Sequence, residues 1–249
     1  MTVKAIIFDA YGTLFDVYSI SALANRLFPG KGTALTELWR DKQIQYSQLR
    51  TLCSTYKPFW EVTQDALVFS CRKLGLDLDL AAQNTMMGQY AKLQPFPENL
   101  AVLRALKAQG MKLAILSNGN QDMLAAVVAN ARMEDLFSHV ISVESVKKFK
   151  TAPEAYQLGI DLLGAAARDI VFVSSNGWDI CGASWFGYRT FWVNRADAPM
   201  EELGVMPHGQ GRLLSDLPPF IEANMASSPA PAAHQPPGTS TIPNDKPRD

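Results

Sequence analysis

The chain of 249 residues has little excess charge of either sign, little cysteine and no long apolar run. Its 23 Lys and Arg against 24 Asp and Glu give a net charge of −1, which argues against nucleic-acid and membrane-surface partners. Its three cysteines, Cys53, Cys71 and Cys181, lack metal-ligand spacing and indicate reduced packing residues. No run is long enough to span a bilayer, and the one before Asp9 is too short for a signal peptide. We therefore expect a soluble cytoplasmic protein that binds neither nucleic acid nor membrane.

Hydrophobic residues make up 47% of the chain, enough for one substantial core. Five short runs are almost continuously apolar instead of alternating, which is typical of strands covered on both faces. Helical patterns follow or separate these runs, and that alternation predicts an α/β fold with a doubly wound parallel sheet. The predicted strands are 4–8, 112–116, 139–143, 169–173 and 189–193, and the predicted helices between them are 98–109, 121–131, 153–163 and 179–186.

The interval 17–96 interrupts this alternation. It contains no convincing strand, and the prolines of "QPFPENL" (94–100) indicate a return to the sheet. We therefore expect a helical cap, residues 17–96, inserted after the first strand of a core made of residues 1–16 and 97–224. The predicted cap helices are 19–27, 34–53, 58–74 and 79–92.

The last 25 residues, 225–249, have a different composition. They hold six of the 15 prolines, no aromatic residue and almost no large aliphatic one. Such a segment cannot bury enough apolar surface to offset its ordering entropy, so the composition predicts a disordered tail.

Polar residues follow four of the predicted strands. They are Asp9, Ser117 with Asn118, Lys150, and the segment "SSNGWD" (174–179). Singly, each has an ordinary interpretation as a turn former, a helix cap or part of a solvated loop. The carboxyl ends of parallel strands meet at one edge of the sheet, where ligands bind. Together these residues predict a site with a carboxylate nucleophile, hydrogen-bond donors, a cation and a second carboxylate.

Four segments in this order resemble the haloacid dehalogenase (HAD) superfamily: "FDAYGT" (8–13), "LSNGN" (116–120), "KTAPEAY" (150–156) and "FVSSNGWD" (172–179). With "ELWRDKQIQYS" (37–47) and "WFGYRTFWVNR" (185–195), the detail is similar to the L-2-haloacid dehalogenase branch, over nearly all of residues 3–222. The resemblance implies a HAD-like core with a helical cap, and a hydrolase that converts (S)-2-haloacids and water to (R)-2-hydroxyacids and halide. It implies no cofactor, and a homodimer.

The same resemblance implies that Asp9 attacks the substrate with inversion and becomes an ester, while Lys150 balances its charge. Asp179, with Asn176 and Ser174, would then activate the water that hydrolyses this ester. The other catalytic positions that the resemblance implies are Thr13 beside the nucleophile, Arg40 as halide acceptor, Ser117, and Tyr156 near Lys150.

The substrate carboxylate is expected on Ser117, Asn118 and the backbone amides of Ala10 and Tyr11, because fixed amide donors suit an anion. Arg40 suits a departing halide, since its guanidinium is permanently charged and weakly hydrated. The walls of an apolar pocket around the α-substituent are expected from Tyr11, Ile44, Phe59 and Trp178. For these four side chains, plain core packing is an equally open interpretation.

Tyr11 distinguishes this chain from the phosphatases of the superfamily, which carry a second acid two residues after the nucleophile. A departing alkoxide needs that acid's proton, whereas halide leaves as a stable anion. Those phosphatases also hold Mg²⁺ with two carboxylates in the fourth segment, where this chain has Asp179 alone and Ser175. We therefore expect no metal. A phosphatase or phosphonatase, and a catalytically idle binding protein of the superfamily, are the alternatives.

Three positions depart from the family pattern. Thr151 stands where a proline usually follows the active-site lysine, which loosens the expected placement of Lys150. Asp41 replaces a glutamine beside Arg40, and its carboxylate would repel a halide unless it points away. Gln48 replaces a tryptophan and predicts a more polar pocket.

Overall fold

The computed structural model describes residues 3–226. Six parallel strands form one sheet in the order β3-β2-β1-β4-β5-β6. The five strands expected from the apolar runs are confirmed, each to within one residue at either end. The sixth, β6, was not predicted, because its sequence "GQG" has no apolar side chain. The strands are β1 (Ala5–Phe8), β2 (Lys112–Ser117), β3 (His139–Ser142), β4 (Ile170–Ser174), β5 (Arg189–Val193) and β6 (Gly209–Gly211).

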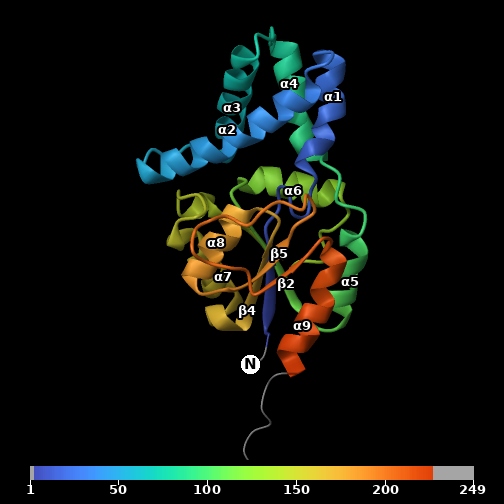
Figure 1. Cartoon of the computed structure of the whole chain (residues 1–249), viewed down its shortest axis with the longest axis vertical. Coiled ribbons are helices and arrows are strands. Elements are labelled where there is room, and N and C mark those ends of the chain that lie inside the picture. Colours follow the sequence, from blue (N-terminus) through green and yellow to red (C-terminus); the bar gives the residue numbers. More distant parts are fainter. Residues whose placement is uncertain (1–2, 227–249) are drawn as a thin grey trace, which may run out of the picture.

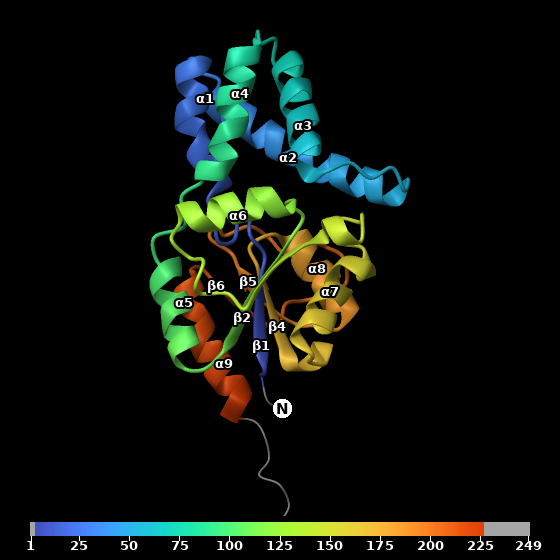
Figure 2. The same cartoon turned by 180° about the vertical axis from the view of Figure 1, so that it is seen from behind.

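Helices cover both faces of this sheet, so the predicted α/β doubly wound class is confirmed. Figures 1 and 2 show α5 and α9 over one face and α7 and α8 over the other, with α6 near the edge where the strands end. The helices of this layer are α5 (Asn99–Ala108), α6 (Gln121–Asn130), α7 (Pro153–Leu163), α8 (Gly177–Phe186) and α9 (Leu217–Ala226). Short 3₁₀ segments are η3 (Val143–Ser145), η4 (Ala167–Asp169) and η5 (Leu214–Asp216).

A second group of helices stands beyond the carboxyl ends of the strands (Figure 1). Its long helix α2 packs against α1 and α3, and Leu35, Trp39, Val62 and Leu67 are buried there. Residues 17–96 contain no strand, as the sequence predicts. Our cap and core boundaries, 16/17 and 96/97, stay a prediction. The elements are η1 (Val17–Ile20), α1 (Ser21–Leu27), α2 (Gly32–Leu52), α3 (Phe59–Lys73), α4 (Leu80–Gly88) and η2 (Gln89–Lys92).

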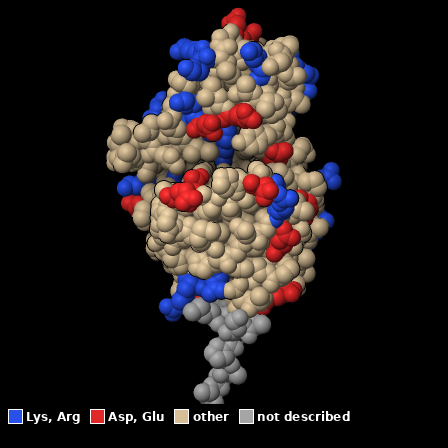
Figure 3. Space-filling view, in the orientation of Figure 1, with Lys and Arg blue, Asp and Glu red and all other residues tan. Residues whose placement is uncertain are grey.

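Helix α9 runs to Ala226, two residues into the segment for which the composition predicts disorder. The rest of that predicted tail, 227–249, lies outside the described residues. Among residues 3–226 there is no helix with the length and apolarity that crossing a membrane requires. Figure 3 shows Lys and Arg interspersed with Asp and Glu over one face of the molecule, in keeping with the near-zero net charge.

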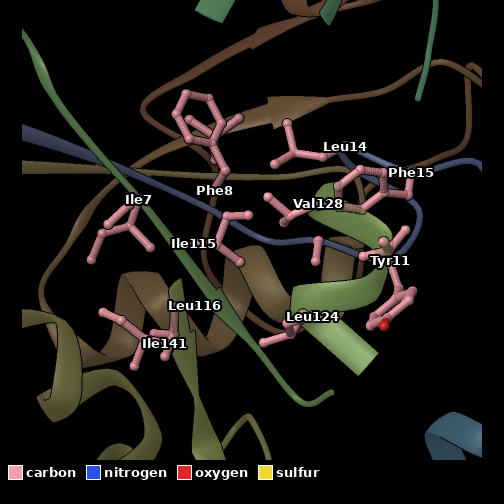
Figure 4. Close-up of a cluster of buried hydrophobic side chains, with 14 of the residues drawn as sticks. Ile7, Phe8, Tyr11, Leu14, Phe15, Ile115, Leu116, Leu124, Val128 and Ile141 are labelled. Atoms are coloured by element: carbon pink, nitrogen blue, oxygen red, sulfur yellow. The ribbon is translucent and has the colours of Figure 1, made fainter. Parts of the chain in front are cut away.

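The apolar core surrounds β1, the strand that leads directly to Asp9. All four residues of β1 are buried, and Figure 4 shows Phe8, Ile115 and Leu124 in the apolar cluster that also holds Tyr11. Close packing of this kind fixes backbone position, because any shift opens a cavity or a clash. The residue that follows β1, Asp9, is therefore held on a rigid support.

Candidate active site

The strand order reverses between β1 and β4, because β1 lies between strands whose connections run in opposite directions. Such a switch point opens a crevice at the carboxyl ends of the strands. Phe8 is in register with Val173 of β4 and Ile115 of β2. The next residue, Asp9, consequently faces the loops that follow both neighbouring strands.

Asp9 accepts three side-chain hydrogen bonds. Lys150 Nζ lies 3.0 Å from Asp9 Oδ1, while Thr13 Oγ1 at 2.8 Å and Asn176 Nδ2 at 3.0 Å both donate to Oδ2. Gly12 makes the tight turn for Thr13 possible, since its φ of +95° lies in the region that favours glycine. Lys150 and Thr13 were expected at the nucleophile by resemblance, whereas Asn176 was expected beside Asp179 and donates to Asp9 instead.

Lys150 also binds a second carboxylate, with Nζ 2.9 Å from Asp179 Oδ2. Burial lowers the pKa of the Lys150 ammonium, but the neighbouring charges of Asp179 and Asp9 raise it more, so its pKa lies above the ordinary value. Burial raises the pKa of Asp179, against the opposing effect of Lys150. Lys150 is therefore a buried cation between two carboxylates, both of which it partly neutralises.

Tyr156 completes this network from α7. Its hydroxyl donates to Asp179 Oδ1 at 2.8 Å. Burial, and next the charge of Asp179, raise the pKa of Tyr156 well above its ordinary value. The phenol therefore stays protonated and holds the carboxylate of Asp179 in a fixed orientation.

Arg40 reaches the same edge from α2, on the opposite side of the site. Its Nη2 donates to Tyr11 O at 3.0 Å and to Asn176 Oδ1 at 3.3 Å, and its Nη1 donates to Gln43 Oε1 at 2.7 Å. All three acceptors are neutral, although Arg40 is only 7% exposed. A buried cation that makes no ion pair with a described carboxylate is suited to bind an anion.

A small cavity lies between Asp9 and Arg40, and it takes in the apolar side chains that the sequence assigns to the pocket wall. The volume open to the centre of a water molecule is ≈ 10 Å³, roughly the room for one water. A larger ligand has to push these walls apart. Every lining residue except Ser47 was predicted as a site residue: Asp9, Tyr11, Arg40, Ile44, Ser47, Phe59, Ser117, Asn118 and Trp178.

Unused backbone donors follow Asp9 directly, next to the cavity that Tyr11 lines. In the part of the chain that the structure describes, the amides of Ala10 and Tyr11 donate no hydrogen bond, and the buried Tyr11 hydroxyl has no partner. Ser117 Oγ accepts from Gly119 N at 3.2 Å, and Asn118 Oδ1 accepts from Lys150 N at 2.9 Å. The Ser117 proton and the Asn118 amide nitrogen are thus oriented by the loops themselves.

Ser174 and Ser175 divide their tasks differently from the sequence expectation. Ser174 Oγ accepts from Asn176 N at 3.1 Å, and among the described residues it makes no hydrogen bond to Asp9 or Asp179. Ser175 was not predicted as a site residue. Its N donates to Thr13 Oγ1 at 2.8 Å and its Oγ donates to Gly12 O at 2.6 Å. Ser174 therefore orients Asn176, and Ser175 orients Thr13.

Two further residues escaped the sequence analysis. Gln43 is fully buried and binds Arg40, and Ser47 lines the cavity. Both lie on the face of α2 that carries Arg40 and Ile44, at the spacing of three and seven residues from Arg40. Helical periodicity starting from Arg40 was the signal that would have found them.

The three departures from the family pattern lie in different surroundings. Asp41 and Gln48 are exposed, so the Asp41 carboxylate points away from the cavity and Gln48 does not line it. The prediction that Gln48 makes this pocket more polar is therefore not supported by its position. Thr151 packs against α8, where a Cβ on Gly182 would lie 2.6 Å from Thr151 Cγ2.

The donor set does not favour a metal ion. Among residues 3–226 there is no group of three or more His, Cys, Asp or Glu side chains suited to hold one. The two carboxylates of the site, Asp9 and Asp179, both bind the Lys150 ammonium. A divalent cation would have to displace this ammonium group.

Comparison with known proteins agrees with this geometry. A (S)-2-haloacid dehalogenase of Pseudomonas sp. (strain YL) is 46% identical over 205 residues, which cover 82% of this chain and 88% of the relative. A crystal structure of an L-2-haloacid dehalogenase is 52% identical with a TM-score of 0.88, covering 89% of this chain and all of that one. The L-2-haloacid dehalogenase of Xanthobacter autotrophicus with chloropropionic acid covalently bound is 38% identical, with a TM-score of 0.83 and coverage of 89% and 99%.

A family model described as haloacid dehalogenase-like hydrolase matches residues 3–187, most of the described chain. This match spans the first strand, the helical interval, the loop that carries Lys150 and the helix α8 that carries Asp179. The chain belongs to the haloacid dehalogenase-like hydrolases.

Proposed function

We propose that the protein hydrolyses (S)-2-haloacids to (R)-2-hydroxyacids and halide, through an ester on Asp9 and with inversion at the α-carbon. One observation carries the proposal: Asp9, oriented by three donors, lies across one cavity from Arg40, a buried cation whose hydrogen-bond partners in the described structure are all neutral. The names of the relatives, (S)-2-haloacid dehalogenase among them, support it. We further propose a cytoplasmic homodimer that needs no cofactor.

In the first step, a carboxylate oxygen of Asp9 attacks the α-carbon from the side opposite the halogen. The new C–O bond forms as the carbon–halogen bond breaks, and the bonding pair leaves with the halide toward Arg40. No proton is required, because halide is stable as an anion. Tyr11, where a phosphatase has its acid, fits this chemistry.

In the second step, water attacks the carbonyl carbon of the Asp9 ester. Asp179 accepts a proton from the water, and the bond to the hydroxyacid oxygen then breaks and that oxygen takes up the proton. The pKa of Asp179, raised by burial, favours such a base. The second proton of the water is released to solvent, and Asp9 regains its carboxylate with one oxygen from water.

The charges of the site are compatible with an anionic substrate. Asp9 and Asp179 carry two negative charges, and Lys150 and Arg40 carry two positive ones. The substrate carboxylate would rest on Ser117, Asn118 and the free amides of Ala10 and Tyr11, which need no counter-charge. The departing halide would have Arg40 as its counter-ion.

Incubation with (S)- and (R)-2-chloropropionate, with detection of chloride and of product chirality, tests the proposal. We expect chloride from the (S) substrate alone, (R)-lactate as product, and the same rate in millimolar chelator. A generic phosphoester in Mg²⁺ is the matched substrate for the phosphatase alternative. Release of phosphate without release of chloride would overturn the dehalogenase, and inertness toward both would favour the idle binding protein.

A further inference from the structure

We infer that Gln43 is a positioning residue that holds the Arg40 guanidinium in place for the halide and, being neutral, leaves its charge available. The inference rests on the proposed function. Gln43 does not line the cavity, so it acts through Arg40 and not on the substrate.

Gln43 occupies the shortest contact that Arg40 makes. Its Oε1 lies 2.7 Å from Arg40 Nη1, one turn away on α2, and the side chain is fully buried. The other end of the amide is equally fixed, since Gln43 Nε2 donates to Thr63 Oγ1 of α3 at 2.6 Å. Thr63 in turn donates to Phe59 O at 2.7 Å. These hydrogen bonds connect the guanidinium to Phe59, one of the residues that line the cavity.

The amide is chemically specific at this position. Arg40 Nη2 is already bound to the core, through Tyr11 O and Asn176 Oδ1, so Gln43 fixes the remaining rotation of the guanidinium plane. An apolar side chain of similar size would fill the space but leave Nη1 without an acceptor. A carboxylate would accept the same bond but form a buried ion pair with Arg40 and compete with the halide.

These properties predict an effect confined to the halide. Halide is present during formation of the Asp9 ester and absent during its hydrolysis. Variation of Gln43 should therefore slow ester formation and weaken halide binding, while hydrolysis of the ester proceeds at its normal rate. Loss of packing alone would slow both steps together.

The test compares Gln43→Met and Gln43→Glu with Gln45→Glu. Gln45 is exposed on the same helix and binds only Lys42 in the described structure, so it controls for the added charge. Bromide binding to each folded variant is titrated calorimetrically, and both chemical steps are followed in single turnovers with (S)-2-bromopropionate. We expect bromide affinity and ester formation to fall ~10-fold for Gln43→Met and ~100-fold for Gln43→Glu. Gln45→Glu should match the wild type.

A double-mutant cycle with Arg40→Ala separates positioning from packing, because Gln43→Met should add nothing once Arg40 is gone. Unchanged bromide affinity in both Gln43 variants, or equal slowing of both chemical steps, would overturn the inference. If Gln43→Glu does not fold, Gln43→Met decides alone. Wild-type protein that binds bromide but releases none from a haloacid would refute the proposed function and leave the role of Gln43 to the titration.

Discussion

The sheet edge and helix α2 supply the two sides of the cavity, and they treat charge in opposite ways. At the sheet edge, the two carboxylates Asp9 and Asp179 share one cation of opposite sign, Lys150, which lies between them. On α2, Arg40 is buried among neutral acceptors. The sheet edge therefore holds a balanced, fixed set of groups for covalent chemistry, and α2 keeps one unbalanced cation for the anion that the reaction creates.

The two sides of the cavity also differ in how extensively their side chains are hydrogen-bonded to one another. Asp9, Lys150, Asp179 and Tyr156 form a continuous network on strand ends and the helices that follow them. Among residues 3–226, Arg40 is linked to this network through the side chain of Asn176, and it also donates to the backbone oxygen of Tyr11. Variants on the two sides should consequently fail in different ways, and the following predictions use that difference.

The largest effect is expected at the nucleophile. Asp9→Asn keeps the size of the side chain and its contact with Thr13 but removes the attacking charge, so chloride release should fall at least ~10⁴-fold. The variant should remain folded, because Lys150 keeps Asp179 as partner. Chloride release and circular dichroism, read soon after purification, check both points. Activity near that of wild type would remove Asp9 from the mechanism.

Lys150→Met should damage stability as well as activity, unlike any change on α2. It leaves two carboxylates without their shared buried cation, which costs about 3–5 kcal/mol of unfolding free energy. The pKa of Lys150 is raised in the folded protein, so its stabilising effect is fully present below the ordinary lysine value of 10.5. It is lost as pH rises through the higher folded value.

Urea denaturation of wild type and Lys150→Met at several pH values measures this difference. The gap in unfolding free energy should be constant from neutral pH to about 10 and shrink only above that. A gap that already closes near neutral pH would show that Lys150 is not charged in the folded protein.

Arg40→Lys should reduce halide release by ~100-fold with little change in stability, since lysine keeps the charge but loses the planar fork that spans Gln43 and Tyr11. Arg40→Ala should be slower still. Melting temperature and single-turnover rates distinguish this pattern from that of Lys150→Met. Wild-type rates in both Arg40 variants would mean that α2 contributes no anion site.

Tyr156→Phe should give the smallest loss, ~10-fold and confined to ester hydrolysis, because it removes one hydrogen bond to the proposed base Asp179. Trapping the reaction by acid and measuring labelled ester on the protein follows this step directly. More ester than in wild type is the expected result. A slower first step with no build-up of ester would assign Tyr156 to the nucleophile instead.

The sequence was most informative where local pattern determines structure. The apolar runs predicted β1 to β5 because buried parallel strands need continuous apolar side chains, and strand ends then grouped Asp9, Ser117, Lys150 and Asp179. β6 gave no signal, since Gly209–Gly211 pairs through its backbone alone. The different contacts of Ser174 and Ser175 were not predictable from the motif that contains both. Successive side chains at the end of a strand point to opposite sides, which a motif does not record.

The α2 side of the site was less predictable for a related reason. Arg40 came from resemblance, which names single positions and not the contacts that hold them. Gln43 and Ser47 became visible only through the helix geometry that brings them to the face of Arg40. Partners of this kind depend on how α2 packs against α3, which no short segment encodes.

The most direct test of the account is a single turnover in ¹⁸O-water with enzyme in excess over (S)-2-chloropropionate. An ester on Asp9 requires the first product to carry unlabelled oxygen, because its hydroxyl oxygen comes from the Asp9 carboxylate. Mass spectrometry of the peptide that contains Asp9 should then find one ¹⁸O atom in that side chain. Lactate labelled in its hydroxyl group, together with an unlabelled Asp9 peptide, would show direct attack by water and contradict the account.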